Sequence, residues 1–335
     1  MALSSTSTTL LAGLALTGSG LLLAAARRSR RKLTAARFSA DRARAGVAHG
    51  AERLSPVGAP DGTGGPGGWR ARASGDRRLL AYFFLTVLLA IPFWLFGGGK
   101  LPLPVNLPVG ALVTFVPMTA AALVAYRYEG KAGARALFRR ALDFRRIKDG
   151  RWYLPALLLM PAIYVASYMV MRLLGRPLPE QVELSLPAAL AFLAIFFIGD
   201  IGEELGWTAF ATDPLQRRWG AMRAGLLLGL VWDAWHIVPW IQTGNSALWI
   251  AWQALYSIAL RILIVWVYNG SGRSVFAAIL VHVASNVSWS LFPNYGTHYD
   301  PFVTALAAWV AVTLVLLWWE PATLARLRQA RARGS

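Results

Sequence analysis

Eight apolar stretches follow one another between residues 79 and 319, and short polar segments separate them. Each is long enough, as an α-helix, to cross the hydrocarbon layer of a bilayer, which takes about 20 residues. We therefore predict an all-α, polytopic membrane helix bundle. Its predicted spans are Leu79–Phe96, Val109–Tyr126, Trp152–Met171, Pro187–Gly206, Ala224–Trp240, Leu248–Tyr268, Val275–Phe292 and Pro301–Trp319.

The composition supports a membrane protein and limits the chemistry. Of the 335 residues, 56% are hydrophobic and only 15% are charged, and the mean hydropathy is +0.46, which is outside the soluble globular range. The chain has no cysteine, which excludes disulfides, thiolate metal sites and cysteine nucleophiles. Any catalysis must use carboxylate, imidazole, hydroxyl or amide groups.

The net charge of +18 is concentrated in three segments. Residues 27–78 carry 13 Lys/Arg against 4 acids, residues 127–151 carry 9 against 3, and residues 320–335 carry 4 against 1. Basic residues mark cytoplasmic segments of membrane proteins. The pattern predicts a multi-pass protein of the cell membrane, with the N-terminus of the eight-helix core and the C-terminus cytoplasmic. It argues against a nucleic-acid partner.

The hydropathy and charge patterns divide the chain into three parts. Residues 1–78 are expected to hold a candidate extra span at Leu10–Ala26 and a disordered basic linker, unless the true start lies downstream. Residues 79–320 form the predicted transmembrane domain, with the motif core at 187–292. Residues 321–335 form a basic cytoplasmic tail.

The basic connection 127–151 has two interpretations. Apolar residues alternate with its arginines, as in an amphipathic helix that lies on anionic inner-leaflet lipids. A solvated basic loop fits the same residues. We leave both open.

Three carboxylates close the fourth predicted span. Helical spacing stacks Asp200 under Glu203 and Glu204, at i+3 and i+4. Ionisable groups at membrane depth are expensive, so they are functional-site candidates by default. Like charges this close in low dielectric cannot all stay ionised, an arrangement suited to a general base. A helix end in interfacial water is the simpler alternative.

Two of the four histidines lie in later spans. His236 is in the fifth, and His282 and Asn286 share one face of the seventh, one turn apart. At about 1.5 Å per residue, these spans can bring the histidines to the level of the carboxylates in the inner half of the bilayer. We predict one buried polar site.

These residues resemble the CPBP (Abi) family of intramembrane proteases, the type II CAAX prenyl and bacteriocin-processing enzymes. The family motifs are Glu-Glu-x-x-x-Arg, Phe-x-x-x-His and His-x-x-x-Asn/Asp, on successive core helices. Their order, spacing and membrane context are matched over about residues 150–292. The matching residues are Glu203-Glu204-Leu-Gly-Trp-Thr208, Trp232-Asp-Ala-Trp-His236 and His282-Val-Ala-Ser-Asn286.

The resemblance implies an intramembrane endopeptidase. Glu203 or Glu204, with His236, would activate water, and His282 and Asn286 would stabilise the oxyanion. It also implies a membrane-associated peptide or protein substrate. Because Glu204, His236 and His282 together make a ligand set that a catalytic zinc accepts, zinc stays an open alternative, although His-Glu-x-x-His is missing.

Two residues depart from the family pattern. Thr208 stands where the motif arginine is expected, and Trp232 replaces the motif phenylalanine and keeps an aromatic wall. Arg261 lies inside the sixth span, so we predict that it replaces the missing cation and pairs with Glu203, Glu204 or Asp200. An arginine that snorkels to the interface is the alternative. Asp233 either orients His236 or caps the carboxylates.

Other functions fit the sequence less well. Asn269–Gly272 is similar to a rhomboid serine motif and Gly199-Asp200 to a presenilin-like motif, but both lack the expected context. A proton-coupled transporter could use the same acids and histidines, but the chain shows no convincing internal repeat. A catalytically inactive relative that binds membrane partners is a third alternative, favoured by Thr208.

Overall fold

The computed structural model describes residues 66–97 and 109–325, and its regular elements are all helices, which confirms the all-α prediction. The long helices are α2 (Pro66–Phe96), α3 (Val116–Arg139), α4 (Tyr153–Leu173), α5 (Leu186–Gly206), α7 (Ala221–Gln242), α8 (Ala247–Gly270), α9 (Val275–Tyr295) and α10 (Pro301–Trp318). The shorter ones are η1 (Val109–Phe115), η2 (Arg140–Leu142), η3 (Phe144–Arg146), η4 (Gly150–Trp152), the π-helix η5 (Trp207–Thr212) and α6 (Asp213–Trp219).

Eight helical stretches in the described residues are long and apolar enough to cross a membrane, as predicted. The second and fourth, Val109–Leu142 and Leu186–Trp219, extend over 34 residues each. They exceed the predicted spans because the helices continue into polar sequence, which a hydropathy window excludes. If all eight helices cross the membrane, the two ends of this bundle lie on the same side. That both ends are cytoplasmic stays a prediction.

The N-terminal prediction is wrong in one respect. α2 begins at Pro66, so residues 66–78 are helical where we expected a disordered linker. Four arginines, which favour helices, lie in this segment, and the helix continues from it into the apolar span. The candidate span Leu10–Ala26, the linker as far as residue 65 and the tail after residue 325 lie outside the described residues.

The basic segment after the second predicted span is mainly helical. α3 breaks at Gly130, whose φ of +66° suits glycine, and then continues to Arg139. Past this break Leu137 is buried, whereas Phe138 and Leu142 are 46% and 60% exposed. A helix with one buried and one exposed apolar face fits the amphipathic interpretation of this segment better than a solvated loop. Contact with lipid stays a prediction.

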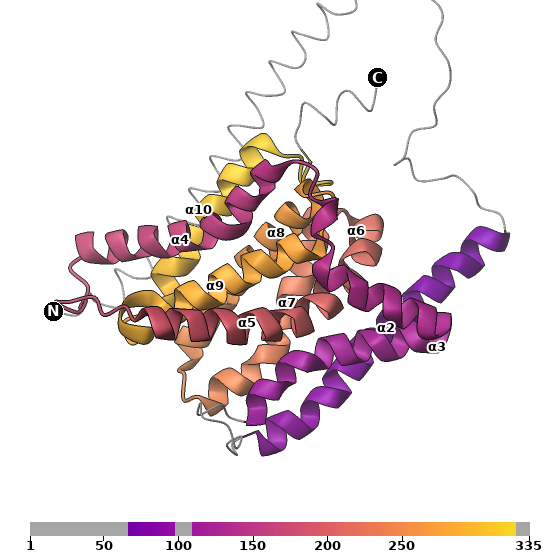
Figure 1. The fold of residues 1–335 in the computed structure, drawn as a ribbon, viewed down its shortest axis with the longest axis horizontal. Helices are drawn as coiled ribbons and strands as arrows, with labels where there is room; N and C mark the ends of the chain where they lie inside the picture. Colours follow the sequence, from indigo (N-terminus) through magenta and orange to yellow (C-terminus); the bar gives the residue numbers. More distant parts are fainter. Residues whose placement is uncertain (1–65, 98–108, 326–335) are drawn as a thin grey trace, which may run out of the picture. The chain divides into compact units, whose positions relative to one another are not determined.

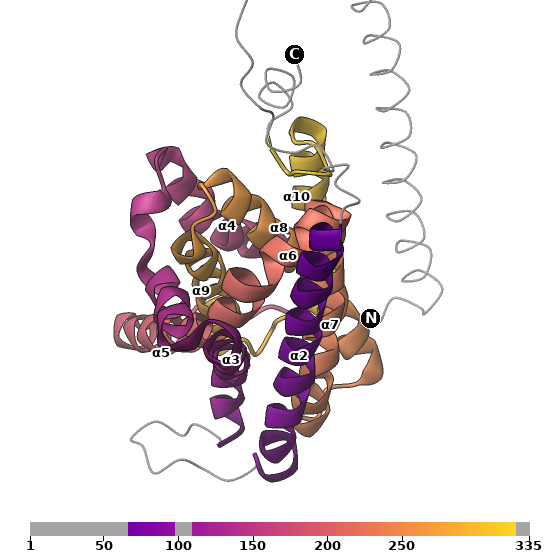
Figure 2. The same cartoon turned by 90° about the vertical axis from the view of Figure 1, so that its right-hand side faces the viewer.

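α8 lies at the centre of the bundle (Figure 1). Its thirteen residues Tyr256–Tyr268 are all buried, because α7, α9 and α10 pack around them. α5 packs against α3 and α9, and α2 lies beside α3 (Figure 2). The motif helices α5, α7 and α9 therefore meet close to the buried middle of α8.

Glycines let α5 approach the helix pair η1 and α3 closely. A Cβ at Gly202 would lie 2.7 Å from the backbone oxygen of Thr114, and one at Gly206 would lie 2.6 Å from the backbone carbonyl carbon of Pro117. Real Cβ atoms do not come so near to backbone. The two glycines on either side of the glutamate pair therefore set the distance between α5 and its neighbour.

We expect Gly206→Ala to lower stability by about 1–3 kcal/mol, the usual cost of overpacking. The added methyl group would collide with the Pro117 backbone, which cannot rotate away. Thermal unfolding in detergent measures the effect. Gly150→Ala is the matched control, since a Cβ there meets nothing within 4 Å. Equal melting temperatures for the two variants would contradict this packing.

Candidate active site

The glutamate pair lies where α5 changes its winding. Glu203 and Glu204 occupy the last turn of α5, and the π-helix η5 begins at Trp207. π-turns are rare and often occur at functional sites. The change lets the chain continue as helix into α6 while both carboxylates stay inside the bundle, where they are 7% and 0% exposed.

Glu204 is fully paired. The Nη1 group of Arg261 lies 2.9 Å from each of its carboxylate oxygens. His282 Nδ1 lies 2.9 Å from Oε1, and the Thr208 hydroxyl donates to Oε2. Of the three carboxylates considered as partners of Arg261, the structure thus places Glu204 against it. The residue that stands at the motif arginine position, Thr208, also binds this carboxylate.

Glu203 is held more loosely. The indole Nε1 of Trp232 donates to its Oε2 over 2.7 Å, and the Thr114 hydroxyl, from η1, lies 3.3 Å from its Oε1. No ion pair with an arginine or lysine is formed by Glu203 in the described part of the chain. Its carboxylate therefore keeps capacity for further hydrogen bonds.

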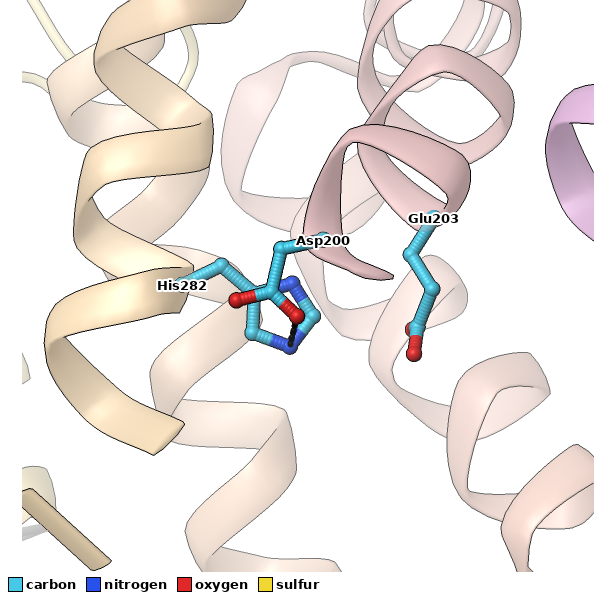
Figure 3. A group of neighbouring side chains, drawn as sticks. All are labelled: Asp200, Glu203 and His282. Atoms are coloured by element: carbon cyan, nitrogen blue, oxygen red, sulfur yellow. Dashed lines mark ion pairs between the residues drawn. The ribbon is translucent and has the colours of Figure 1, made fainter. Parts of the chain in front are cut away.

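His282 lies between two carboxylates. Its Nδ1 faces Glu204, and its Nε2 lies 3.8 Å from Oδ1 of Asp200 (Figure 3). Asn286, one turn further along α9, donates from Nδ2 to the same Asp200 oxygen over 2.9 Å. The second oxygen of Asp200 is buried without a hydrogen-bond partner. Asp200 thus holds the two predicted oxyanion donors together.

His236 lies at the edge of this cluster and is partly exposed. Its Nδ1 is 2.9 Å from the backbone carbonyl oxygen of Trp232. Because a carbonyl oxygen only accepts, Nδ1 carries the proton, which leaves Nε2 of the neutral ring free to accept one. The ring stacks on Trp240 and meets the edge of Trp235.

Trp232 connects the two halves of the site. Its ring is 5.1 Å from that of His236 and 5.2 Å from that of His282, and the guanidinium of Arg261 lies 4.6 Å above it. From the sequence we expected only an aromatic wall. The indole N–H, which binds Glu203, is a further contact that phenylalanine could not make.

Asp200, Glu203 and His282 form a candidate metal site. Each can offer one ligand atom, and these atoms lie within 4.8 Å of one another. The set shares His282 with the predicted zinc ligands but contains neither Glu204, which is fully paired, nor His236. Two carboxylates and one imidazole are donors that a divalent cation accepts, and the unpartnered Asp200 oxygen is free to bind one. These residues therefore fit a metal.

Comparison with known proteins identifies the region that carries this site. Residues 185–288 match the family described as type II CAAX prenyl endopeptidase Rce1-like. An alignment of length 147, which covers 40% of this chain and 54% of the relative, is 29% identical to "CAAX prenyl protease 2" of Methanococcus maripaludis, so the chain spans about half the length of that protein. The predicted resemblance is thus confirmed: residues 185–288, which include all the predicted site residues, are similar to the type II CAAX prenyl endopeptidases.

Proposed function

We propose that this protein is an intramembrane endopeptidase that hydrolyses a peptide bond of a membrane-associated substrate. The contrast between the two glutamates supports the proposal most directly. Glu204 is saturated by Arg261, Thr208 and His282, whereas Glu203 has open hydrogen-bonding capacity and shares Trp232 with His236. Such an arrangement can activate water, because the buried carboxylate can accept a further hydrogen bond and the neighbouring imidazole has a nitrogen that can accept one as well.

In the proposed mechanism Glu203 is the general base. It takes a proton from a water molecule that also binds Nε2 of His236, and the resulting hydroxide attacks the scissile carbonyl carbon. The proton then passes to the leaving amine. Trp232 orients the Glu203 carboxylate, so the base needs little rearrangement as the reaction proceeds.

His282 and Asn286 would stabilise the oxyanion. Asn286 has a second N–H beyond the one bound to Asp200, and the Nε2 side of His282 is 3.8 Å from Asp200, longer than a hydrogen bond. Because Nδ1 of His282 donates to Glu204, its Nε2 donates to a developing negative charge when the ring is an imidazolium, and the free N–H of Asn286 donates beside it. Glu204 fixes the ring of His282 from the other side. Donors held in this way cost little to reorganise in the transition state.

A metal is the alternative to this mechanism, and the cluster of Asp200, Glu203 and His282 favours it. These three residues would hold the cation, which would polarise the scissile carbonyl and acidify water when bound. We propose that Glu203 and His236 act as the base without it. The two mechanisms differ in their sensitivity to chelator.

The substrate should lie in or on the membrane, because the site is enclosed by apolar helices. The amphipathic segment supports a lipid partner as well: Phe138, Leu142 and Phe144 are 46%, 60% and 47% exposed beside a dense group of arginines. We propose that this segment binds anionic lipids of the inner leaflet. A prenyl group on the substrate has no support in the described contacts.

Cleavage of a membrane-peptide library by the detergent-purified protein tests the function. We expect products from the wild type, with and without chelator. His236→Ala should produce at least about 100-fold less, because it removes the imidazole that positions the water. His298→Ala is the matched control, since His298 lies outside the cluster and its Nδ1 contacts only Thr297.

Three outcomes would contradict parts of the proposal. No cleavage by a well-folded wild type would favour a transporter or an inactive relative. Equal activity in the His236→Ala variant would remove His236 from the mechanism. Loss of activity with chelator, restored by added zinc, would make Asp200, Glu203 and His282 metal ligands.

A further inference from the structure

One buried carboxylate has no part in the proposed mechanism. Asp233 on α7 is 5% exposed, and neither of its carboxylate oxygens accepts a hydrogen bond of good geometry from a described residue. The nearby Ser257 hydroxyl donates to the backbone oxygen of Gln253 instead. A buried acceptor without a donor is costly, so Asp233 requires an explanation.

Arg261 has hydrogen-bond donors that are buried without an acceptor. Its side chain is 0% exposed, and only Nη1 is used, on Glu204. Nε and Nη2 are buried and have no hydrogen-bond partner in the described part of the chain. A guanidinium has five N–H donors, so Arg261 can bind a second carboxylate without releasing the first.

α7 and α8 pack antiparallel, and the guanidinium of Arg261 lies over the ring of Trp232, the residue before Asp233. A Cβ at Gly225 would lie 3.2 Å from Cα of Ile262, and one at Gly229 would lie 2.9 Å from Cα of Ile258. Asp233 follows Gly229 at i+4, so it continues the stripe of α7 that faces α8. It lies one turn further along, about two helical turns from the backbone of Arg261, and the two side chains lean toward the N-termini of their antiparallel helices and so toward each other.

We propose that Asp233 is the second counter-charge of Arg261, across a gap that one buried water would bridge. Glu204 and Asp233 then hold the guanidinium from two sides, above the ring of Trp232 at 4.6 Å. Asp233 is a positioning residue: it touches no reacting group but keeps Nη1 on Glu204. A buried site with the polar partners found here can hold such a water.

This arrangement explains how the arginine can come from α8. At the motif position, four residues after Glu204, a cation would share a helix face with its carboxylate. Arg261 instead reaches Glu204 from another helix and needs a second contact to fix its orientation. Its contribution to catalysis rests on the proposed function, but its charge pairing does not.

A double-mutant cycle on thermal stability tests the pairing without reference to activity. Asp233→Asn keeps the shape of the side chain and removes its charge, so it should lower Tm in the wild-type background. In an Arg261→Met background the same change should raise Tm or leave it unchanged, because Asp233 has then lost its partner. An equal decrease in both backgrounds would overturn the proposal.

If Arg261→Met does not fold, Arg261→Lys replaces it in the cycle. Lysine keeps the charge but has no donors at Nε and Nη2, so Asp233→Asn should lower Tm less in this background than in the wild type. A loss as large as in the wild type would again contradict the pairing. The matched control for removal of a carboxylate is Asp213→Asn, whose partner Arg273 lies outside the site at 3.7 Å.

Kinetics then test the positioning role. Asp233→Asn should lower kcat roughly 10- to 100-fold with KM unchanged, because a displaced Arg261 releases Glu204 without touching the substrate. The Asp213→Asn control should leave both constants unchanged. A normal kcat in a variant that shows the predicted stability coupling would restrict Asp233 to folding. Without activity in the wild type, the stability cycle still decides the pairing.

Discussion

Glu203→Gln is expected to reduce kcat by about 100- to 10,000-fold while the protein keeps its fold. Glutamine preserves the size of the side chain, and its carbonyl oxygen can still accept the hydrogen bond from Trp232. The amide cannot take a proton from water. The loss should therefore appear in kcat, with little change in KM, and is measured by steady-state cleavage of a peptide selected from the library.

Two controls separate this loss from a general effect. Glu180→Gln makes the same substitution at an exposed position outside the cluster and should leave kcat unchanged. Glu204→Gln should instead reduce stability, since it breaks a charge pair with Arg261. A Glu203→Gln variant that cleaves at the wild-type rate would show that Glu203 is not the base.

Much of the fold could be predicted because lipid imposes simple rules. Each span must satisfy its backbone internally and present apolar side chains, so helix number and position follow from hydropathy. The ends of the helices could not be predicted in this way. α3 continues beyond Tyr126, and the helix of α5 continues through the π-helix η5. Both extensions are polar, and hydropathy does not predict whether a polar segment is helical.

The sequence predicted that these polar groups form one buried cluster, but it could not predict most of the contacts between them. Polar groups at membrane depth were conspicuous, so Glu203, Glu204 and the histidines were found directly. Their roles depend on contacts between distant segments. Arg261 was expected to pair with one of three carboxylates, but its contact with Glu204, 57 residues away, could not be singled out. Spacing within one helix contains no information about such contacts.

Arg261→Met is expected to have the largest effect on stability. It removes the cation from Glu204, and both side chains are 0% exposed, so the carboxylate would be left buried and uncompensated. Breaking a buried pair from one side costs about 3–5 kcal/mol, whereas methionine replaces most of the lost volume. The measurement is thermal unfolding in detergent, with cleavage assayed on the folded fraction.

A second substitution should restore what the first removes. Thr208 already donates to Glu204 from the following turn, so Thr208→Arg would bring a guanidinium to the same carboxylate from η5. In the Arg261→Met background it should recover part of the stability and cleavage. In the wild-type background it should destabilise, because two cations would compete for one carboxylate in a closed space. An Arg261→Met variant as stable as the wild type would instead mean that Arg261 is not the partner that keeps Glu204 charged.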